Sequence, residues 1–358
     1  MGGKGEDKEV QAMIANRKRA LVLAAAVSVV AVVAFAATVH AQGKGNTWHS
    51  LRETFKQGDT LRYDVRANVT GMMAMAGGGA QQTMPINMQL KTGTKMDVLE
   101  VDSAGTATVK TTMDEMTMDM QMMGQSMEMR LGAGGMKMYS GGQLMFDSSQ
   151  AGGDGLSAGA MPGFPGIPSD TDFSQIFAKG VTTTITRQGE VSVPEMAGQL
   201  GGEGFANPNA LRDLFLPRKL VRPGDRWGLD LSALGVDMPA ELPPGITLES
   251  TFEGIEQFKG RECAKIVTVL DVDVSQLPLE ELGGPQVDAS KSGLDGRATA
   301  YFDIERGHFV RQEGDISIAF AGSGLPMPMG PPMGAGGASS NASMDIRLKI
   351  SFEVELKE

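Results

Sequence analysis

The sequence predicts an all-β protein built as one large, curved, mainly antiparallel sheet, half-barrel-like in shape and with long strands. Runs of alternating apolar and polar residues occur near both ends of the chain, at residues 61–69 and 344–356. Alternation with period two places the apolar side chains on one face of a strand. The second run would be about 40 Å long at roughly 3.3 Å per residue, which suits a broad twisted sheet better than a small sandwich.

Turn signals between these runs predict hairpins, because each places turn residues between strand-forming residues. The expected turns are at residues 101–105, 187–190, 256–260 and 303–307. Helical patterns are scarce by comparison. Two short helices are expected, at residues 172–179 and 209–215, the first between an aspartate cap and a glycine stop.

The N-terminal region predicts export from the cytoplasm. Basic residues 17–19 precede an uncharged, alanine- and valine-rich run at residues 20–37, and small residues Val39 and Ala41 follow. This pattern is typical of a secretory signal peptide spanning residues 1–41. The run is also near the lower length limit of a spanning helix, so an uncleaved anchor is the alternative. Either arrangement places the remaining chain in the periplasm, the cell envelope or the extracellular space.

Glycine- and proline-rich stretches divide the rest of the chain. The full sequence contains 48 glycines and 17 prolines. We expect a methionine-rich β half at 42–147, a Gly/Pro-rich linker or loop at 148–171, and a second β half at 172–358. The second half is expected in the same sheet or packed closely against it, with a disordered loop at 322–341.

Charge and composition exclude several function classes. The formal net charge of −11 disfavours nucleic acid as a partner, because an acidic surface repels phosphates. The single cysteine, Cys263, excludes an intramolecular disulfide and a cysteine-rich zinc site, and is interpreted as a small core residue. Beyond the signal only His49 and His308 could serve a catalytic centre, and neither adjoins a nucleophile motif. We therefore expect no enzyme and no cofactor, with a pocket of scattered acids as the alternative.

Methionine is the most unusual feature of the composition. Of 26 methionines, seventeen lie between Met72 and Met145. Spacing of two places four of them on one face of a strand, and these are the candidate ligand-binding residues. They are Met116, Met118, Met120 and Met122.

Three interpretations of this stripe remain open. Methionine is flexible and polarizable, so the stripe suits an adaptable apolar surface for a lipophilic small molecule. It equally suits the packed core of a structural or protein-interaction module, whose partner is another envelope protein. A third alternative is Cu(I) binding, because thioethers suit soft metals, although both histidines are distant in sequence and no metal ligand is predicted. Membrane contact is expected only through the N-terminal segment, if it is uncleaved.

Four segments in order resemble a secreted bacterial β-rich family known as a domain of unknown function. They are residues 55–63 (FKQGDTLRY), 221–227 (VRPGDRW), 252–255 (FEGI) with 260–266 (GRECAKI), and 300–311 (AYFDIERGHFVR). The resemblance implies an exported β-rich domain. It also implies a fold similar to the half-barrels of periplasmic lipoprotein carriers, which hold acyl chains on a concave apolar face. No reaction or catalytic residue follows from this fold-level analogy.

Overall fold

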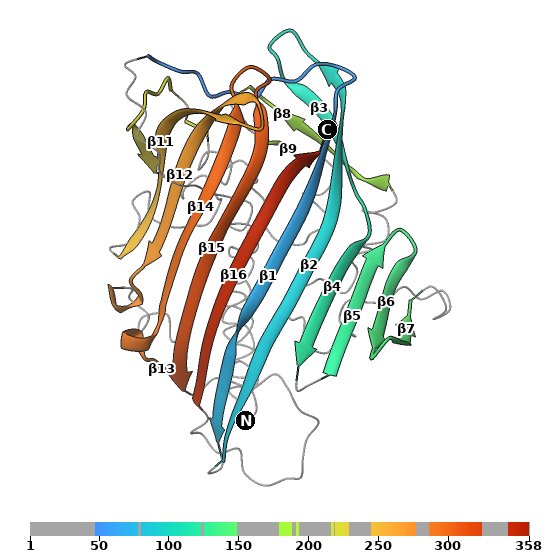
Figure 1. Cartoon of the computed structure of the whole chain (residues 1–358), viewed down its shortest axis with the longest axis vertical. Helices are drawn as coiled ribbons and strands as arrows, with labels where there is room; N and C mark the ends of the chain where they lie inside the picture. Colours follow the sequence, from blue (N-terminus) through green and yellow to red (C-terminus); the bar gives the residue numbers. More distant parts are fainter. Residues whose placement is uncertain are drawn as a thin grey trace, which may run out of the picture.

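The protein is one broad antiparallel sheet in a computed structural model (Figure 1). The model describes residues 47–77, 80–122, 125–148, 179–187, 191–192, 216–217, 219–228, 245–276, 286–323 and 343–357. These residues contain sixteen strands in an open order, so the predictions of an all-β class and of a single large antiparallel sheet are confirmed. The half-barrel-like curvature stays a prediction.

Several expected features lie outside the described residues. They are the signal segment 1–41, the linker apart from its first residue, the helix expected at 209–215, and the helix expected at 172–179 apart from Lys179. The strand before the second expected loop runs to Ser323, and residues 324–341 of that loop also lie outside. No helix among the described residues is long and apolar enough to cross a membrane.

The first and last strands lie side by side in the middle of the sheet. β1 (Thr60–Gly77) pairs with β2 (Ala80–Val101) on one side and with β16 (Ser343–Lys357) on the other. Beyond β16 the order continues through β15 (His308–Ser323), β14 (Gly293–Asp303), β12 (Arg261–Val272), β11 (Ile246–Phe258) and β10 (Arg226–Gly228). From β1 at the centre the chain therefore builds the sheet outward through β2 to one edge, and from β10 at the other edge it returns to the centre at β16.

Beyond β2 the sheet divides into two branches. One contains β3 (Ala107–Met113), β8 (Val181–Ile185) and β9 (Val191–Ser192); the other contains β4 (Met116–Met122), β5 (Gln125–Gly132), β6 (Gly135–Ser140) and β7 (Gln143–Asp147). Figure 1 shows them diverging from the long β2. The break falls at Asp114 and Glu115, where the Asp114 amide donates to the Gly93 carbonyl at 2.8 Å. A Cβ on Gly93 would meet the Asp114 carboxylate at 2.2 Å, so glycine permits this approach.

Short elements complete the fold, and three of the four predicted hairpins are confirmed. β13 (Gln286–Val287) pairs with β15, and two 3₁₀ turns, η4 (Val274–Gln276) and η5 (Ala289–Lys291), lie in the β12–β14 connection. For the expected turn at 187–190, β8 pairs with β9, and residues 188–190 lie outside the described residues. The other predicted turns join β2 to β3, β11 to β12, and β14 to β15. In the last of these turns, Gly307 has a φ of 70°, which favours glycine.

The main core lies on one face of the sheet, here called the inner face. A row of opposed residues defines it across six strands: Phe252, Ile266, Ala300, Gln312, Val354 and Val65. All six are buried. Leu51, Leu216 and Val221 pack on this face from outside the sheet. A smaller cluster, with Val98, Val109 and Ile185, fills the β3–β8 branch.

Candidate ligand-binding face

The candidate methionines lie on β4, between β2 and β5. Residues directly opposite in an antiparallel pair project to the same face, with Cβ atoms about 4.5–5.5 Å apart. Met118 lies opposite Leu90 of β2 and Met129 of β5. Met120 lies opposite Met88 and Met127, Met116 opposite Leu131, and Met122, the last residue of β4, opposite Gln125. The strand places Met116, Met118 and Met120 on one face, as their spacing predicts.

Other strands extend these pairs into two rows, which we call the methionine face. One row contains Ala67, Leu90, Met118, Met129, Met138 and Phe146, and the other contains Val69, Met88, Met120 and Met127. Both begin on β1 at residues that also pack against the main core. The methionine face is therefore a continuation of the inner face. Sequence reasoning missed the contribution of β2, although the alternation of Met84, Ile86, Met88 and Leu90 was a usable signal.

The methionine face is less buried than the main core. Met118, Met120, Met127, Met129 and Met138 are all half-buried, and none belongs to a buried core cluster of the described residues. By contrast, Phe252, Ile266 and Phe302 of the inner face are fully buried. Met136, which is in register with Leu131 and Met116 on the same side, is an exception at 4% exposed. At the five half-buried positions the thioether and methyl groups are partly accessible.

The opposite face of the same branch is polar. Thr117, Asp119 and Gln121 alternate with the methionines of β4. On β5 the Arg130 guanidinium lies 2.6 Å from Glu128 and 5.3 Å from the ring of Tyr139. The two faces of this branch therefore present different chemistry, apolar on one side and charged on the other.

Two shallow hollows among the described residues lie away from the methionine face. One, of about 340 Å³, lies at the branch point and is lined by Asp114, Glu115, Arg130 and Lys137. The other, of about 440 Å³, crosses the outward side of β1, β14, β15 and β16. The first is lined mainly by charges of mixed sign, whereas the second combines Asp295, Arg347 and Lys349 with the apolar Ile318, Ala319 and Leu348.

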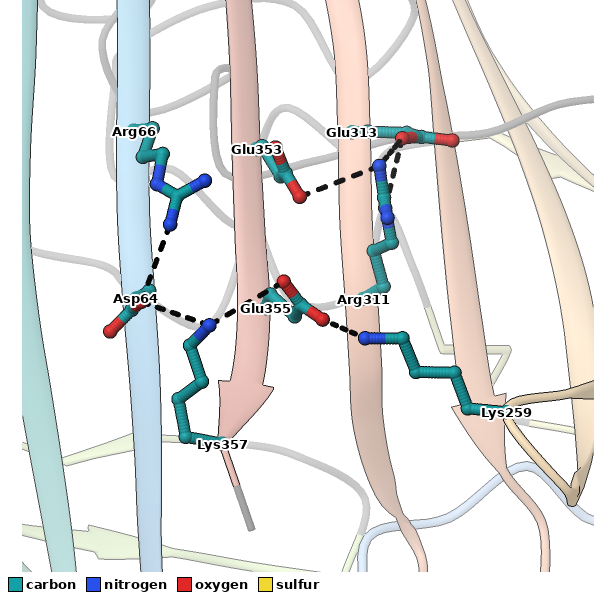
Figure 2. Close-up of polar contacts among 8 residues, drawn as sticks. All are labelled: Asp64, Arg66, Lys259, Arg311, Glu313, Glu353, Glu355 and Lys357. Atoms are coloured by element: carbon teal, nitrogen blue, oxygen red, sulfur yellow. Dashed lines mark hydrogen bonds and ion pairs between the residues drawn. The ribbon is translucent and has the colours of Figure 1, made fainter.

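Figure 2 shows a charged ladder on the outward side of the central strands. Lys357 lies 3.1 Å from Asp64 and 3.7 Å from Glu355, and Lys259 also contacts Glu355. Arg311 pairs with Glu313 and lies 3.4 Å from Glu353. With Arg66, which is 3.6 Å from Asp64, the ladder contains four acids and four cations. Ion pairs of this kind stabilise the pairing of neighbouring strands. Because the charges are balanced, the ladder offers no net charge to a ligand.

The structure also assembles a polar row that the sequence did not reveal. Cys263 of β12 lies opposite Asp303 of β14, which lies opposite His308 of β15. The carboxylate occupies the middle position, so no imidazole is placed to take the proton of the thiol. Burial and the nearby Asp303 raise the pKa of Cys263 to about 11. This is the reverse of what a cysteine nucleophile needs, and the interpretation of Cys263 as a core residue is confirmed by its burial.

Asp303 has a structural role in this row. Its Oδ1 accepts hydrogen bonds from the backbone amides of Glu305 at 3.0 Å and Arg306 at 2.9 Å. Its Oδ2 lies 3.5 Å from Arg261. Burial lowers the pKa of His308, which keeps the imidazole neutral near pH 7. The row therefore fixes the β14–β15 turn against β12.

The remaining predicted catalytic and metal-binding candidates are dispersed. His49 packs edge-on against Phe252, with ring centroids 5.5 Å apart, far along the chain and sheet from the methionine branch. Within the described part of the chain, no three His, Cys, Asp or Glu side chains are grouped to hold a metal ion. The methionine face is therefore the feature with the most distinctive chemistry.

Comparisons with known proteins give structural likenesses without a sequence relative. No protein-family model matches the chain, and no curated protein matches it in sequence. Lipovitellin, solved in a study of lipid–protein interactions, is similar with a TM-score of 0.34 and 10% identity; the match covers 85% of this chain and 25% of that chain. The chain thus spans about a quarter of the length of lipovitellin.

Two bacterial structures are similar over most of both chains. One is a DUF1329 family protein from Desulfovibrio piger, with a TM-score of 0.13, 8% identity, and coverage of 80% of this chain and 83% of that chain. The other is an outer membrane lipoprotein-sorting protein domain from Vibrio parahaemolyticus, with a TM-score of 0.13, 10% identity, and coverage of 82% and 83%.

Proposed function

We propose that this chain is a non-enzymatic exported protein of the cell envelope that binds an apolar ligand on its methionine face. The observation that supports this most directly is the row of Met118, Met129 and Met138 on three adjacent strands, half-buried and outside the packed core. Flexible thioether side chains adapt to ligands of irregular shape.

The dimensions of the face favour an extended ligand. The row from Ala67 on β1 to Met138 on β6 crosses five strands. At about 4.8 Å between neighbouring strands, it is roughly 19 Å long. An acyl chain lying across the strands would cover this length and would need no hydrogen-bonding partner. We therefore name a long-chain lipid as the ligand class.

A fluorescent fatty acid tests this proposal. Wild-type protein is expected to enhance the emission of cis-parinaric acid, and Met118→Lys should weaken binding at least tenfold by placing a charge in the apolar row. Gln121→Lys is the matched control, because it adds the same side chain on the polar face of the same strand. Equal binding by both variants, or no enhancement by the wild type, would contradict the proposal. Native mass spectrometry of protein purified from its own envelope should also show a bound lipid.

The same row supports a second candidate function, the binding of Cu(I). Met118, Met129 and Met138 place three soft thioether donors on adjacent strands. Replacing Met129 by Leu keeps the apolar surface and removes the sulfur. If copper is the ligand, Met129→Leu should abolish micromolar Ag(I) or Cu(I) binding and leave cis-parinaric acid binding intact. If lipid is the ligand, neither metal should bind that tightly to the wild type.

A further inference from the structure

A short two-stranded ribbon packs on the inner face near the start of the described chain. His49 and Val221 form an antiparallel bridge, with N–H···O distances of 2.7 and 2.9 Å. Both side chains point toward the core: Val221 is completely buried, and His49 contacts Phe252. Residues flanking such a pair project to the other side of the ribbon. The neighbours of His49 and Val221 therefore face outward.

The outward side of this ribbon exposes large apolar side chains. Trp48 is 56% exposed and Leu220 is 51% exposed, which is unusual for residues of this size. The guanidinium of Arg222 lies 5.3 Å from the centroid of the Trp48 ring, so the two strands present one continuous surface.

Exposed cations adjoin these apolar groups in the sequence, in a chain that is otherwise strongly acidic. Lys219, Arg222 and Arg52 are exposed, while the adjoining Leu51 and Glu53 are buried. One acid, Asp225, lies 3.5 Å from Arg222. We define the Trp48 patch as the outward side chains of Trp48, Leu220 and Arg222 together with the exposed Arg52 and Lys219, which lie within four residues of them in the sequence. The patch is locally basic, although the whole chain has a net charge of −11.

We propose that the Trp48 patch binds the surface of an anionic lipid bilayer. Tryptophan favours the bilayer interface, where its ring is half-solvated, and exposed leucine inserts at the same depth. Lysine and arginine at that depth contact lipid phosphates. The contact does not depend on the methionine face.

Quenching by brominated phosphatidylglycerol vesicles tests the proposal in the full chain. An indole introduced by Leu220→Trp, in a Trp48→Phe and Trp227→Phe background, reports on the patch at a position remote in sequence from the export segment. The matched control is Leu144→Trp in the same background, because Leu144 on β7 is 48% exposed. Circular dichroism establishes that both proteins retain the sheet.

We expect strong quenching at position 220 and none at position 144. Adding Lys219→Glu should weaken vesicle contact by about fivefold or more, since each cation near an anionic surface contributes a factor of that size. Brominated phosphatidylcholine vesicles should quench weakly. Equal quenching at the two positions, or quenching unchanged by Lys219→Glu, would overturn the proposal. A change in emission that depends on protein concentration without vesicles would identify a second copy as the occupant and would also overturn it.

Discussion

Lys357 of the last strand lies 3.1 Å from Asp64 of the first strand, and this contact connects the two ends of the folded chain. β1 and β16 pair over fifteen residue positions, from Arg62 opposite Lys357 to Ala76 opposite Ser343. The ladder in Figure 2 lies on the outward side of this seam. Asp64 is directly opposite Glu355, and the neighbouring Lys357 and Arg66 offset the repulsion between these two carboxylates. A slip of one residue would turn these charged side chains to the inner face, which disfavours other registers.

Within this ladder Arg311 should matter more than Arg66. Arg311 is 27% exposed and joins Glu313 to Glu353, whereas Arg66 is 51% exposed and, among the described residues, pairs with Asp64. Arg311→Gln should lower the free energy of unfolding by about 1 kcal/mol, and Arg66→Gln by less than about 0.5 kcal/mol. Urea denaturation at low and high salt measures both. The difference should shrink at high salt, and equal effects of the two variants would contradict this ranking.

Gly314 should resist even the smallest substitution. It lies on β15 opposite Ala298 of β14, and a Cβ at position 314 would fall 2.0 Å from the Ala298 Cβ. Gly314→Ala should destabilise the protein by about 1–3 kcal/mol, because the two strands must separate. Gly134→Ala is the control, since nothing lies within 4 Å of its added Cβ. Thermal denaturation compares them, and a neutral Gly314→Ala would show that the strands do not approach this closely.

Truncation of Met118 distinguishes an accessible face from a packed core. Phe252 is fully buried in the main core, so Phe252→Ala should cost about 3–5 kcal/mol. Met118 is half-buried, and Met118→Ala should cost less than about 2 kcal/mol, below the range for a buried methionine. Urea denaturation measures both variants. If Met118→Ala instead lowers the free energy of unfolding by about 2–5 kcal/mol, as at core positions, the branch is a packed core and not an accessible ligand-binding face.

Local patterns account for much of the fold that the sequence predicted. Alternation from Met344 to Leu356 predicted β16, and Ile350, Phe352, Val354 and Leu356 are indeed its buried residues. Spacing of two likewise predicted that Met116, Met118 and Met120 share a face. Both are properties of a single strand, and the two-residue repeat of its apolar side chains is enough to predict them.

Pairings between distant strands were beyond such patterns. The pairing of β1 with β16, the branch at Asp114 and the row of Cys263, Asp303 and His308 depend on register between segments far apart in the chain. Alternation of apolar and polar residues predicts which side chains share a face of a strand, but it does not predict which other strand pairs with it. The same reason explains why Leu90 and Phe146 were missed as members of the methionine face.

His308 should make stability fall as the solution becomes mildly acidic. Burial lowers the pKa of His308 below its usual 6.5 in the folded protein, with Asp303 opposing and Arg261 and Arg306 reinforcing the effect. The unfolded chain therefore takes up this proton first, and stability is lost as the pH falls from about 7 through 6.5 toward the folded pKa. His308→Asn should show a smaller difference in unfolding free energy between about pH 7.5 and pH 5.5.

Urea denaturation at several pH values tests this expectation. Three carboxyl groups have a lowered pKa because of hydrogen bonds, and they titrate below this window: Asp97, Asp273 and Asp288. Their contributions fall at more acidic pH, where carboxylates take up protons. Identical pH profiles for His308→Asn and the wild type would show that another group controls stability in this range.

The Cys263 thiol should not react with alkylating reagents while the sheet is folded. Its side chain is completely buried, and a pKa of about 11 leaves almost no thiolate at pH 8. Iodoacetamide should therefore label the native protein far more slowly than the urea-unfolded protein, as followed by mass. Cys263→Ala should be tolerated better than Cys263→Ser, because a buried hydroxyl without a new partner costs about 1–3 kcal/mol. Rapid labelling of the native protein would show that β12 opens readily, and it would restore Cys263 as a candidate reactive group.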